Sequence, residues 1–243
     1  MRTATSKTAL VVSAHAADFV WRAGGAIALH RLRGYAVTVI CLSYGERGES
    51  AKLWRQEGMT LERVKGERRR EAEAAADLLG AADIQFWDLG DYPIRLSETA
   101  LYRLVEVYRS TNPAFVLSHS RKDVYNHDHP AVTDFAQHAR IIAQAHGHNP
   151  GQKVLGAPPM FLFEPHQPEQ CDWKPTVLLD ITSVWEKKRA AIECMAGQEH
   201  LWEYYTRVAL QRGAQAARNS EKSIVYGEGY ESVFPHVVET LAA

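Results

Sequence analysis

Histidine and carboxylate side chains that could bind a metal ion gather in two segments of this sequence. His15 and Asp18 stand three residues apart, in a short turn that follows an apolar run at 9–12. Segment 119–129 holds three histidines and two aspartates and ends at His129. Two histidines and one carboxylate, with a fourth position left open, form a ligand set of catalytic zinc sites. Because such a set contains no cysteine, it would also accept manganese, iron or cobalt.

Two further polar segments carry groups suited to proton transfer or to holding an anion. They follow the apolar runs at 35–42 and 160–163, and their members are Glu46, Arg47, Glu49, Glu164 and His166. A single histidine is more often structural or on the surface than a ligand. We expect that ordinary role for His138, His146, His148, His200 and His236.

All of these polar segments follow stretches that are expected to be β-strands. Strand-like runs occur at 9–12, 35–42, 84–89, 114–118, 160–163 and 176–181. Helical patterns occupy the intervals, from about residue 20 to Gly34 and at 60–79, 97–110, 131–145 and 183–218, the last with a break near Gly197. This alternation predicts an α/β fold with a mostly parallel sheet and helices on both faces. In such a sheet the segments after the strands emerge at one edge, which brings their side chains together.

Length and composition restrict the class of protein. The chain has 243 residues without an internal repeat, which suits a single α/β domain over 1–243, although the final segment, 223–243, shows little periodicity. The net charge is -1 at pH 7 and the longest basic run is 68–70, so we expect no nucleic-acid partner. No apolar run approaches the length of a membrane span, so we expect no membrane partner. An odd number of cysteines without paired spacing predicts reduced thiols in the cytoplasm, at Cys41, Cys171 and Cys194.

Two motifs resemble those of the LmbE-like, PIG-L family of zinc-dependent N-deacetylases. The family's first motif reads AHPDDE before a helix with a Gly-Gly pair, and here 14–19 reads AHAADF before Gly24-Gly25. Asp128-His129 resembles the second motif, HPDH, and the Arg-Arg-x-Glu helix at 68–71 also matches, so the resemblance covers nearly the whole chain. It implies a Rossmann-like fold, a homo-oligomer, and one zinc ion per chain bound by His15, Asp18 and His129.

The sequence departs from the family pattern where the deacetylases perform their chemistry. The general base of those enzymes is the first Asp of their PDD run, and Ala17 stands there in this chain. Ala16 replaces the proline, and Asn126 replaces the first histidine of HPDH. An alanine accepts no proton from water. The resemblance therefore implies a retained scaffold and metal site, with amide hydrolysis disfavoured.

Four longer runs resemble a divergent hydratase branch of the same family, which adds water to a carbon–carbon double bond of an unsaturated tricarboxylate in gallate breakdown. These runs are 13–30, 41–55, 156–173 and 193–213. The resemblance implies Glu49 and His166 as the acid–base pair. A small polycarboxylate substrate needs cations such as the guanidinium fork of arginine. The predicted substrate contacts are Arg47, one of Arg69 or Arg70, and Asn126.

Two other classes of function remain open at this point. One is a zinc N-deacetylase for an amino sugar or related amide, which would need a replacement base near Ala17. The other is a non-catalytic relative that binds a metal and senses or carries a small acid. The many polar residues after the strands disfavour this second alternative.

Overall fold

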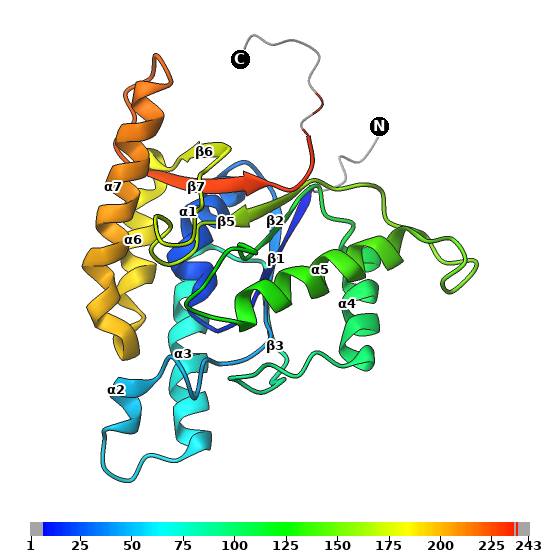
Figure 1. Ribbon diagram of the computed structural model, residues 1–243, viewed down its shortest axis with the longest axis horizontal. Helices are drawn as coiled ribbons and strands as arrows, with labels where there is room; N and C mark the ends of the chain where they lie inside the picture. Colours follow the sequence, from blue (N-terminus) through cyan, green and yellow to red (C-terminus); the bar gives the residue numbers. More distant parts are fainter. Residues whose placement is uncertain (1–6, 236, 238–243) are drawn as a thin grey trace.

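A central sheet organises the molecule (Figure 1). The computed structural model describes residues 7–235 and residue 237, and within that part of the chain the strands form one sheet of order β3-β2-β1-β4-β5-β7-β6. Strand β7 runs antiparallel to both of its neighbours, whereas β1 to β5 pair in parallel. The strands are β1 (Thr8–Ser13), β2 (Ala36–Cys41), β3 (Asp83–Phe86), β4 (Val116–Ser118), β5 (Met160–Phe163), β6 (Val177–Asp180) and β7 (Gly227–Ser232).

Helices lie on both faces of this sheet, as the alternating pattern predicted. They are α1 (Asp18–Leu32), α2 (Ala51–Trp54), α3 (Leu61–Leu79), α4 (Glu98–Thr111), α5 (Asp128–Gln144), α6 (Trp185–Glu193) and α7 (Trp202–Arg218), with 3-10 turns η1 (Thr182–Val184) and η2 (Ala196–Leu201). The expected break near Gly197 falls within η2. Local capping fixes several ends: the Thr60 and Ser97 side chains accept hydrogen bonds at the starts of α3 and α4, and Gly80 ends α3 in a left-handed conformation.

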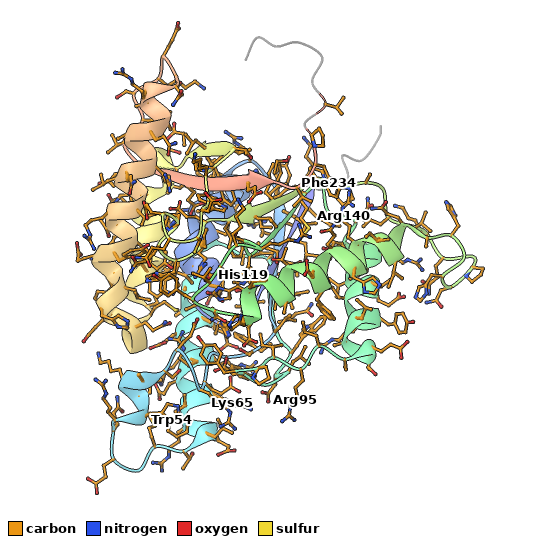
Figure 2. All side chains as sticks on the ribbon, viewed as in Figure 1. Trp54, Lys65, Arg95, His119, Arg140 and Phe234 are labelled. Carbon is orange, nitrogen blue, oxygen red and sulfur yellow. The ribbon has the colours of Figure 1, made fainter. Side chains whose placement is uncertain are left out.

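Side chains alternate between two cores along each strand. In β1, Val11 faces a core shared with α1, α3, α6 and α7, whereas Leu10 and Val12 face a second core under α4 and α5. After β7 the chain reaches the second layer, where the Arg140 guanidinium lies 4.5 Å from the centre of the Phe234 ring (Figure 2). The two cores hold the carboxyl ends of β1 and β4 side by side. There the strand order reverses direction, which is where open α/β sheets bind ligands.

Strand β7 is not predicted by the sequence pattern, because its residues do not look like a buried strand. Gly227 and Gly229 alternate with Glu228, and close packing against α7 explains the glycines. A Cβ atom on Gly227 would lie 2.8 Å from the backbone of Arg212, and one on Gly213 would lie 1.9 Å from the Val225 carbonyl oxygen. Small residues on both elements therefore allow the strand and the helix to touch through their backbones.

Two helices begin earlier than predicted, and this moves candidate ligands into helical turns. Helix α1 begins at Asp18 rather than near residue 20, and α5 begins at Asp128 rather than at 131. His129 thus lies in the first turn of α5 and not in a loop. His236 lies outside the described residues. Among the helices that the structure describes, none combines the length and apolar character needed to cross a membrane.

Candidate metal centre and active site

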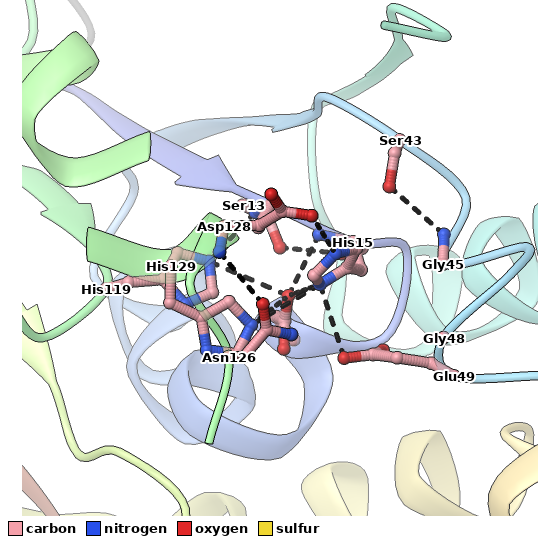
Figure 3. A network of polar contacts seen from close by, with 12 residues as sticks. Ser13, His15, Ser43, Gly45, Gly48, Glu49, His119, Asn126, Asp128 and His129 are labelled. Atoms are coloured by element: carbon pink, nitrogen blue, oxygen red, sulfur yellow. Dashed lines mark hydrogen bonds and ion pairs between the residues drawn. The ribbon is translucent and has the colours of Figure 1, made fainter. Parts of the chain in front are cut away.

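Four metal-ligating side chains meet at the carboxyl edge of the sheet (Figure 3). His15 comes from the turn after β1, Asp18 opens α1, Glu49 comes from the loop after β2, and His129 comes from α5. One ligand atom of each lies within 4.8 Å of all the others. His15, Asp18 and His129 are almost fully buried, whereas the Glu49 side chain is 13% exposed at the rim. These four residues are called the ligand cluster below.

The distances within the ligand cluster fit a tetrahedral metal ion. His15 Nδ1 lies 3.1 Å from Asp18 Oδ2 and 3.3 Å from His129 Nε2, and the last two atoms are 3.4 Å apart. With metal–ligand bonds of about 2.0–2.1 Å, adjacent ligands of a tetrahedral zinc ion are about 3.3 Å apart. The three atoms therefore form one face of such a tetrahedron. Glu49 Oε1, 3.2 Å from His15 Nδ1, lies next to the fourth position.

The tautomer of His129 is fixed by a carboxylate outside the cluster. His129 Nδ1 lies 2.8 Å from Asp123 Oδ2, so that nitrogen donates its proton and Nε2 keeps a lone pair for a metal. The other Asp123 oxygen accepts backbone N–H groups from Tyr125 and Asn126. Burial opposes ionisation, but these bonds and the Arg22 charge lower the pKa of Asp123 to about 2. Asp123 is therefore ionised at neutral pH and holds the imidazole in its metal-binding form.

Carboxylates surround His15 in the same manner. Its Nε2 faces Asp91 Oδ1 at 3.1 Å and Asp128 Oδ2 at 3.5 Å, which leaves Nδ1 directed into the ligand cluster. Asp91 and Asp128 are held in turn by backbone N–H groups of the two loops that meet there. Burial alone lowers the pKa of His15, but the surrounding carboxylates, Glu49 first, outweigh burial and raise that pKa well above its usual range. This concentration of carboxylates around one imidazole is compatible with a bound cation.

His119 lies against the cluster but is not directed into it. Its Nε2 accepts a hydrogen bond of 2.8 Å from the backbone N–H of Ala14, so this nitrogen has no lone pair left for a metal. Its ring stacks on His129 with centroids 4.1 Å apart. Burial and the neighbouring His129 lower the pKa of His119 well below its usual range. His119 is a neutral packing partner that the sequence pattern alone does not distinguish from a ligand.

A buried arginine, Arg22, lies close to Asp18 of the ligand cluster and to Asp123 behind it. Arg22 Nη1 lies 3.3 Å from Asp123 Oδ2, and Arg22 Nε lies 3.7 Å from Asp18 Oδ1. Nη1 also donates to the Glu164 carbonyl oxygen at 3.2 Å. Arg22 was not among the predicted site residues, although a charged residue four positions after Asp18 in an otherwise apolar helix is a detectable signal. Asp91 was missed as well, and it follows a strand end just as the predicted ligands do.

Helix α1 is itself held by a buried carboxylate. Glu228 of β7 accepts backbone N–H groups of Gly25 at 2.7 Å and Ala26 at 2.8 Å, and Lys188 neutralises its charge at 2.7 Å. A Cβ atom on Gly25 would lie 2.6 Å from Ile181 Cγ2 and 2.8 Å from Glu228 Oε1. The Gly-Gly pair of the first motif therefore allows strand β7 and its carboxylate to contact the helix that carries Asp18.

The two predicted acid–base residues lie on opposite sides of the buried ligands. The spatial strand order β2-β1-β4-β5 places Glu49 on one flank and His166 on the other. Glu49 Oε2 is buried without a hydrogen-bond partner in the structure. His166 lies outside the ligand cluster, half-buried against Tyr204, with ring centroids 4.6 Å apart. Burial first, and the charge of Arg22 next, lower the pKa of His166.

The predicted substrate contacts are only partly brought to the site. Arg47 lies in the same loop as Glu49 with its side chain exposed, and Asn126 Nδ2 donates to the Tyr92 hydroxyl at 3.0 Å beside the cluster. Arg69 and Arg70 are corrected by the structure: both are exposed on α3 and pair with Glu73 and Glu67 of the same helix. The buried residue of the basic run 68–70 is Arg68.

Arg68 is fully buried and supports the far wall of the site region. Its Nη2 donates to Gln198 Oε1 at 2.6 Å, and its Nη1 donates to Glu71 Oε2 at 2.6 Å. Glu71 in turn accepts the Gly197 backbone N–H at 2.7 Å. The Arg-Arg-x-Glu run therefore fastens η2 to α3, and its charged groups are used within the protein.

Comparison with known proteins agrees with this geometry. The PIG-L family profile, described as GlcNAc-PI de-N-acetylase, matches residues 10–140, more than half of the chain. The chain belongs to the PIG-L family. Its match spans β1 through α5 and so includes every member of the ligand cluster.

Individual relatives divide into a near and a distant group. A 4-oxalmesaconate hydratase of Pseudomonas putida is 66% identical over 97% of this chain and 93% of its own length. The crystal structure of the 4-carboxy-2-hydroxymuconate hydratase from Pseudomonas putida KT2440 superposes with a TM-score of 0.95, at 66% identity, over 97% of this chain and 100% of that one. The N,N'-diacetylchitobiose deacetylase of Pyrococcus horikoshii has a TM-score of 0.77 at 23% identity, over 93% and 84% of the two chains, and shares the fold.

Proposed function

We propose that this PIG-L protein is a hydro-lyase that adds water to the carbon–carbon double bond of 4-oxalomesaconate, giving 4-carboxy-4-hydroxy-2-oxoadipate. One observation carries the proposal beyond the likeness to named hydratases. Glu49, at the rim of the ligand cluster, has one buried carboxylate oxygen, Oε2, without a hydrogen-bond partner among the described residues, while the position of the deacetylase base is the fully buried Ala17. The site therefore retains its candidate metal ligands and has its proton acceptor in a different loop.

We propose one zinc ion per chain, bound by His15, Asp18 and His129. The fit rests on the 3.1–3.4 Å triangle of donor atoms and on Asp123, which fixes the tautomer of His129. A divalent ion held there supplies a Lewis acid that stabilises negative charge developing on an oxygen atom. The abundance of neighbouring carboxylates suits a cation at this position.

Proton transfer is assigned to the two flanking residues. Glu49, with one unpaired oxygen at the rim, accepts the proton of the water that adds to the carbon β to a carboxylate. His166 is assigned the delivery of a proton to the α carbon from the other flank. Parallel strands about 4.8 Å apart place the strand axes of β2 and β5 roughly 14 Å from each other. This spacing leaves room for a small tricarboxylate between the two loops.

The remaining features of the proposal concern the partner and the compartment. The partner is a small polycarboxylate rather than nucleic acid or a membrane, and Arg47 and Asn126 remain candidate contacts. We place the protein in the cytoplasm, where its free thiols Cys41, Cys171 and Cys194 would remain reduced.

The proposed function is tested with the purified, zinc-loaded protein. Loss of the conjugated substrate, followed by ultraviolet absorbance, should show turnover of the unsaturated tricarboxylate. An amine-release assay with N-acetylglucosamine derivatives should show none. Amine release without hydration would overturn the proposal and assign the chain to the deacetylases, and binding of the tricarboxylate without turnover would assign it to non-catalytic carriers.

A further inference from the structure

A cleft of about 560 Å³ opens beside the ligand cluster and has no role in the chemistry described so far. Glu49 belongs to both, since its carboxylate approaches His15 while its side chain lines the cleft. One wall is the segment from Gly48 through α2 to Arg55, and the other is η2. Ligand pockets in proteins commonly have volumes of about 300–1,000 Å³. The cleft is thus large enough for a small organic acid.

The walls of this cleft differ in charge from the ligand cluster. The cluster and its surroundings are crowded with carboxylates, and the buried Arg22 beside them is already engaged by Asp18 and Asp123. The cleft instead carries Lys52 and Arg55, three residues apart on the α2 side. The Arg55 side chain forms no hydrogen bond or ion pair with the described residues, although its backbone N–H donates to the Leu53 carbonyl oxygen. A substrate with several carboxylates needs a cation away from the metal ligands, and these two side chains supply it.

The structure already places a carboxylate on Lys52. Glu199 of η2 extends across the cleft, and its Oε2 lies 2.8 Å from Lys52 Nζ, which also donates to the Ala196 carbonyl oxygen at 3.1 Å. Both side chains are about half exposed, at 45% for Lys52 and 57% for Glu199. An exposed pair of this kind contributes little stability, typically about 0–1 kcal/mol. A carboxylate of the substrate can therefore displace Glu199 at small cost.

The wall that carries Glu199 is fixed from behind. Gln198 and Gly197 of η2 are bound by the buried Arg68 and by Glu71 of α3. This attachment fixes the backbone next to Glu199, while the Glu199 side chain itself remains free to leave Lys52. The cleft consequently has one rigid wall, the two cations Lys52 and Arg55, and Glu199 as the carboxylate that competes for them.

We propose that Lys52 and Arg55 form the subsite for the substrate carboxylate that is remote from the metal, and that Glu199 is an internal competitor for this subsite. The proposal rests on the proposed function, because it takes the substrate to be a small polycarboxylate. Glu199 occupies the Lys52 end in the free protein and gives way when substrate enters. The subsite determines preference for a tricarboxylate over a dicarboxylate, and it takes no part in proton transfer.

The test uses the opposite changes in KM that are expected when a cation of the subsite or its competing carboxylate is removed. Steady-state kinetics are measured for Lys52→Gln, Arg55→Gln and Glu199→Gln in the zinc-loaded protein. The two cation variants should raise KM roughly 3- to 10-fold with kcat within about twofold, as for loss of one partly exposed charge contact. Glu199→Gln should lower KM by about 2- to 3-fold. Arg33→Gln, an exposed arginine at the far end of α1, is the matched control and should leave both constants unchanged.

Calorimetric titration separates this proposal from the proposed function. Propane-1,2,3-tricarboxylate is the probe, and methylsuccinate, which lacks one of its terminal carboxylates, is the dicarboxylate counterpart. Arg55→Gln should weaken binding of the tricarboxylate and leave binding of methylsuccinate unchanged. Probe binding that depends on Arg55, in a protein that hydrates nothing, would support the subsite and defeat the proposed reaction. Active enzyme whose KM and probe affinity are unaffected by Arg55→Gln and Lys52→Gln, or whose KM rises in Glu199→Gln, would overturn the subsite.

Discussion

The substitution Asp123→Asn should weaken metal binding although Asp123 itself binds no metal in this arrangement. One oxygen of Asp123 accepts two backbone N–H groups, at 3.0 Å from Tyr125 and 3.2 Å from Asn126. The other accepts the proton of His129 Nδ1 at 2.8 Å and faces Arg22. All of these partners are donors. An asparagine has only one acceptor oxygen, so it cannot satisfy both sides.

The orientation that an asparagine adopts determines the size of the effect. If its oxygen keeps the two backbone N–H groups, its amide NH₂ faces His129 Nδ1 and favours the tautomer with the proton on Nε2. That proton occupies the position of the metal bond. If the asparagine turns over, the backbone N–H groups lose their acceptor and the loop before α5 is loosened. Loss of such an outer carboxylate typically lowers metal affinity about 10- to 100-fold, or about 1.4–2.7 kcal/mol.

The measurement is the zinc dissociation constant, obtained by competition with a chelating fluorophore at neutral pH. Asp134→Asn is the matched control, because Asp134 lies on α5, the helix that carries His129, and pairs with Arg121 at 2.8 Å on the surface. Circular dichroism verifies that both variants are folded. An Asp123→Asn dissociation constant within twofold of the wild-type value would refute the assignment of His129 Nε2 as a ligand atom held by Asp123.

Three further predictions concern proton transfer, the lost deacetylase base and the packing of α1. Glu49→Gln and His166→Ala should each lower kcat roughly 100- to 10,000-fold, while metal analysis still finds one zinc per chain. If either variant keeps the wild-type turnover, the substituted residue has no part in the mechanism. If either variant loses zinc, the substituted residue is a metal ligand. Ala17→Asp should fail to raise hydration in the same absorbance assay, since position 17 has no part in the proposed proton transfer, and increased turnover would contradict the division of roles. Gly25→Ala should lower the free energy of unfolding by about 1–3 kcal/mol, because its Cβ would overlap Ile181 and Glu228. Gly66→Ala in α3, where a Cβ meets nothing within 4 Å, should instead raise the free energy of unfolding by up to about 1 kcal/mol. Both values are measured by urea denaturation, and equal changes in the two variants would refute the packing argument.

The predicted strands and helices depended on short-range physics, and most of them are confirmed. Hydrophobic periodicity and caps such as Thr60, Ser97 and Gly80 act within a few residues, so they can be identified in the sequence alone. The convergence of candidate ligands after β1, β2 and β4 followed from one rule, that parallel strands end at one edge. The likeness of the motifs to the PIG-L family then singled out His15, Asp18 and His129 among the eleven histidines and many carboxylates.

Tertiary structure alone decided which neighbours of those residues complete the site. Whether Arg68, Arg69 or Arg70 turns inward depends on the rotation of α3 against η2, more than a hundred residues away, and the structure buries Arg68. The exclusion of His119 as a ligand depends on one hydrogen bond from Ala14, and the use of Arg22 depends on Asp123. Strand β7 carried no recognisable sequence signal, because its glycines are required by close packing against the backbone of α7. In each case the deciding contact joins segments distant in sequence, and its energy is set by packing in three dimensions, which local sequence patterns do not encode.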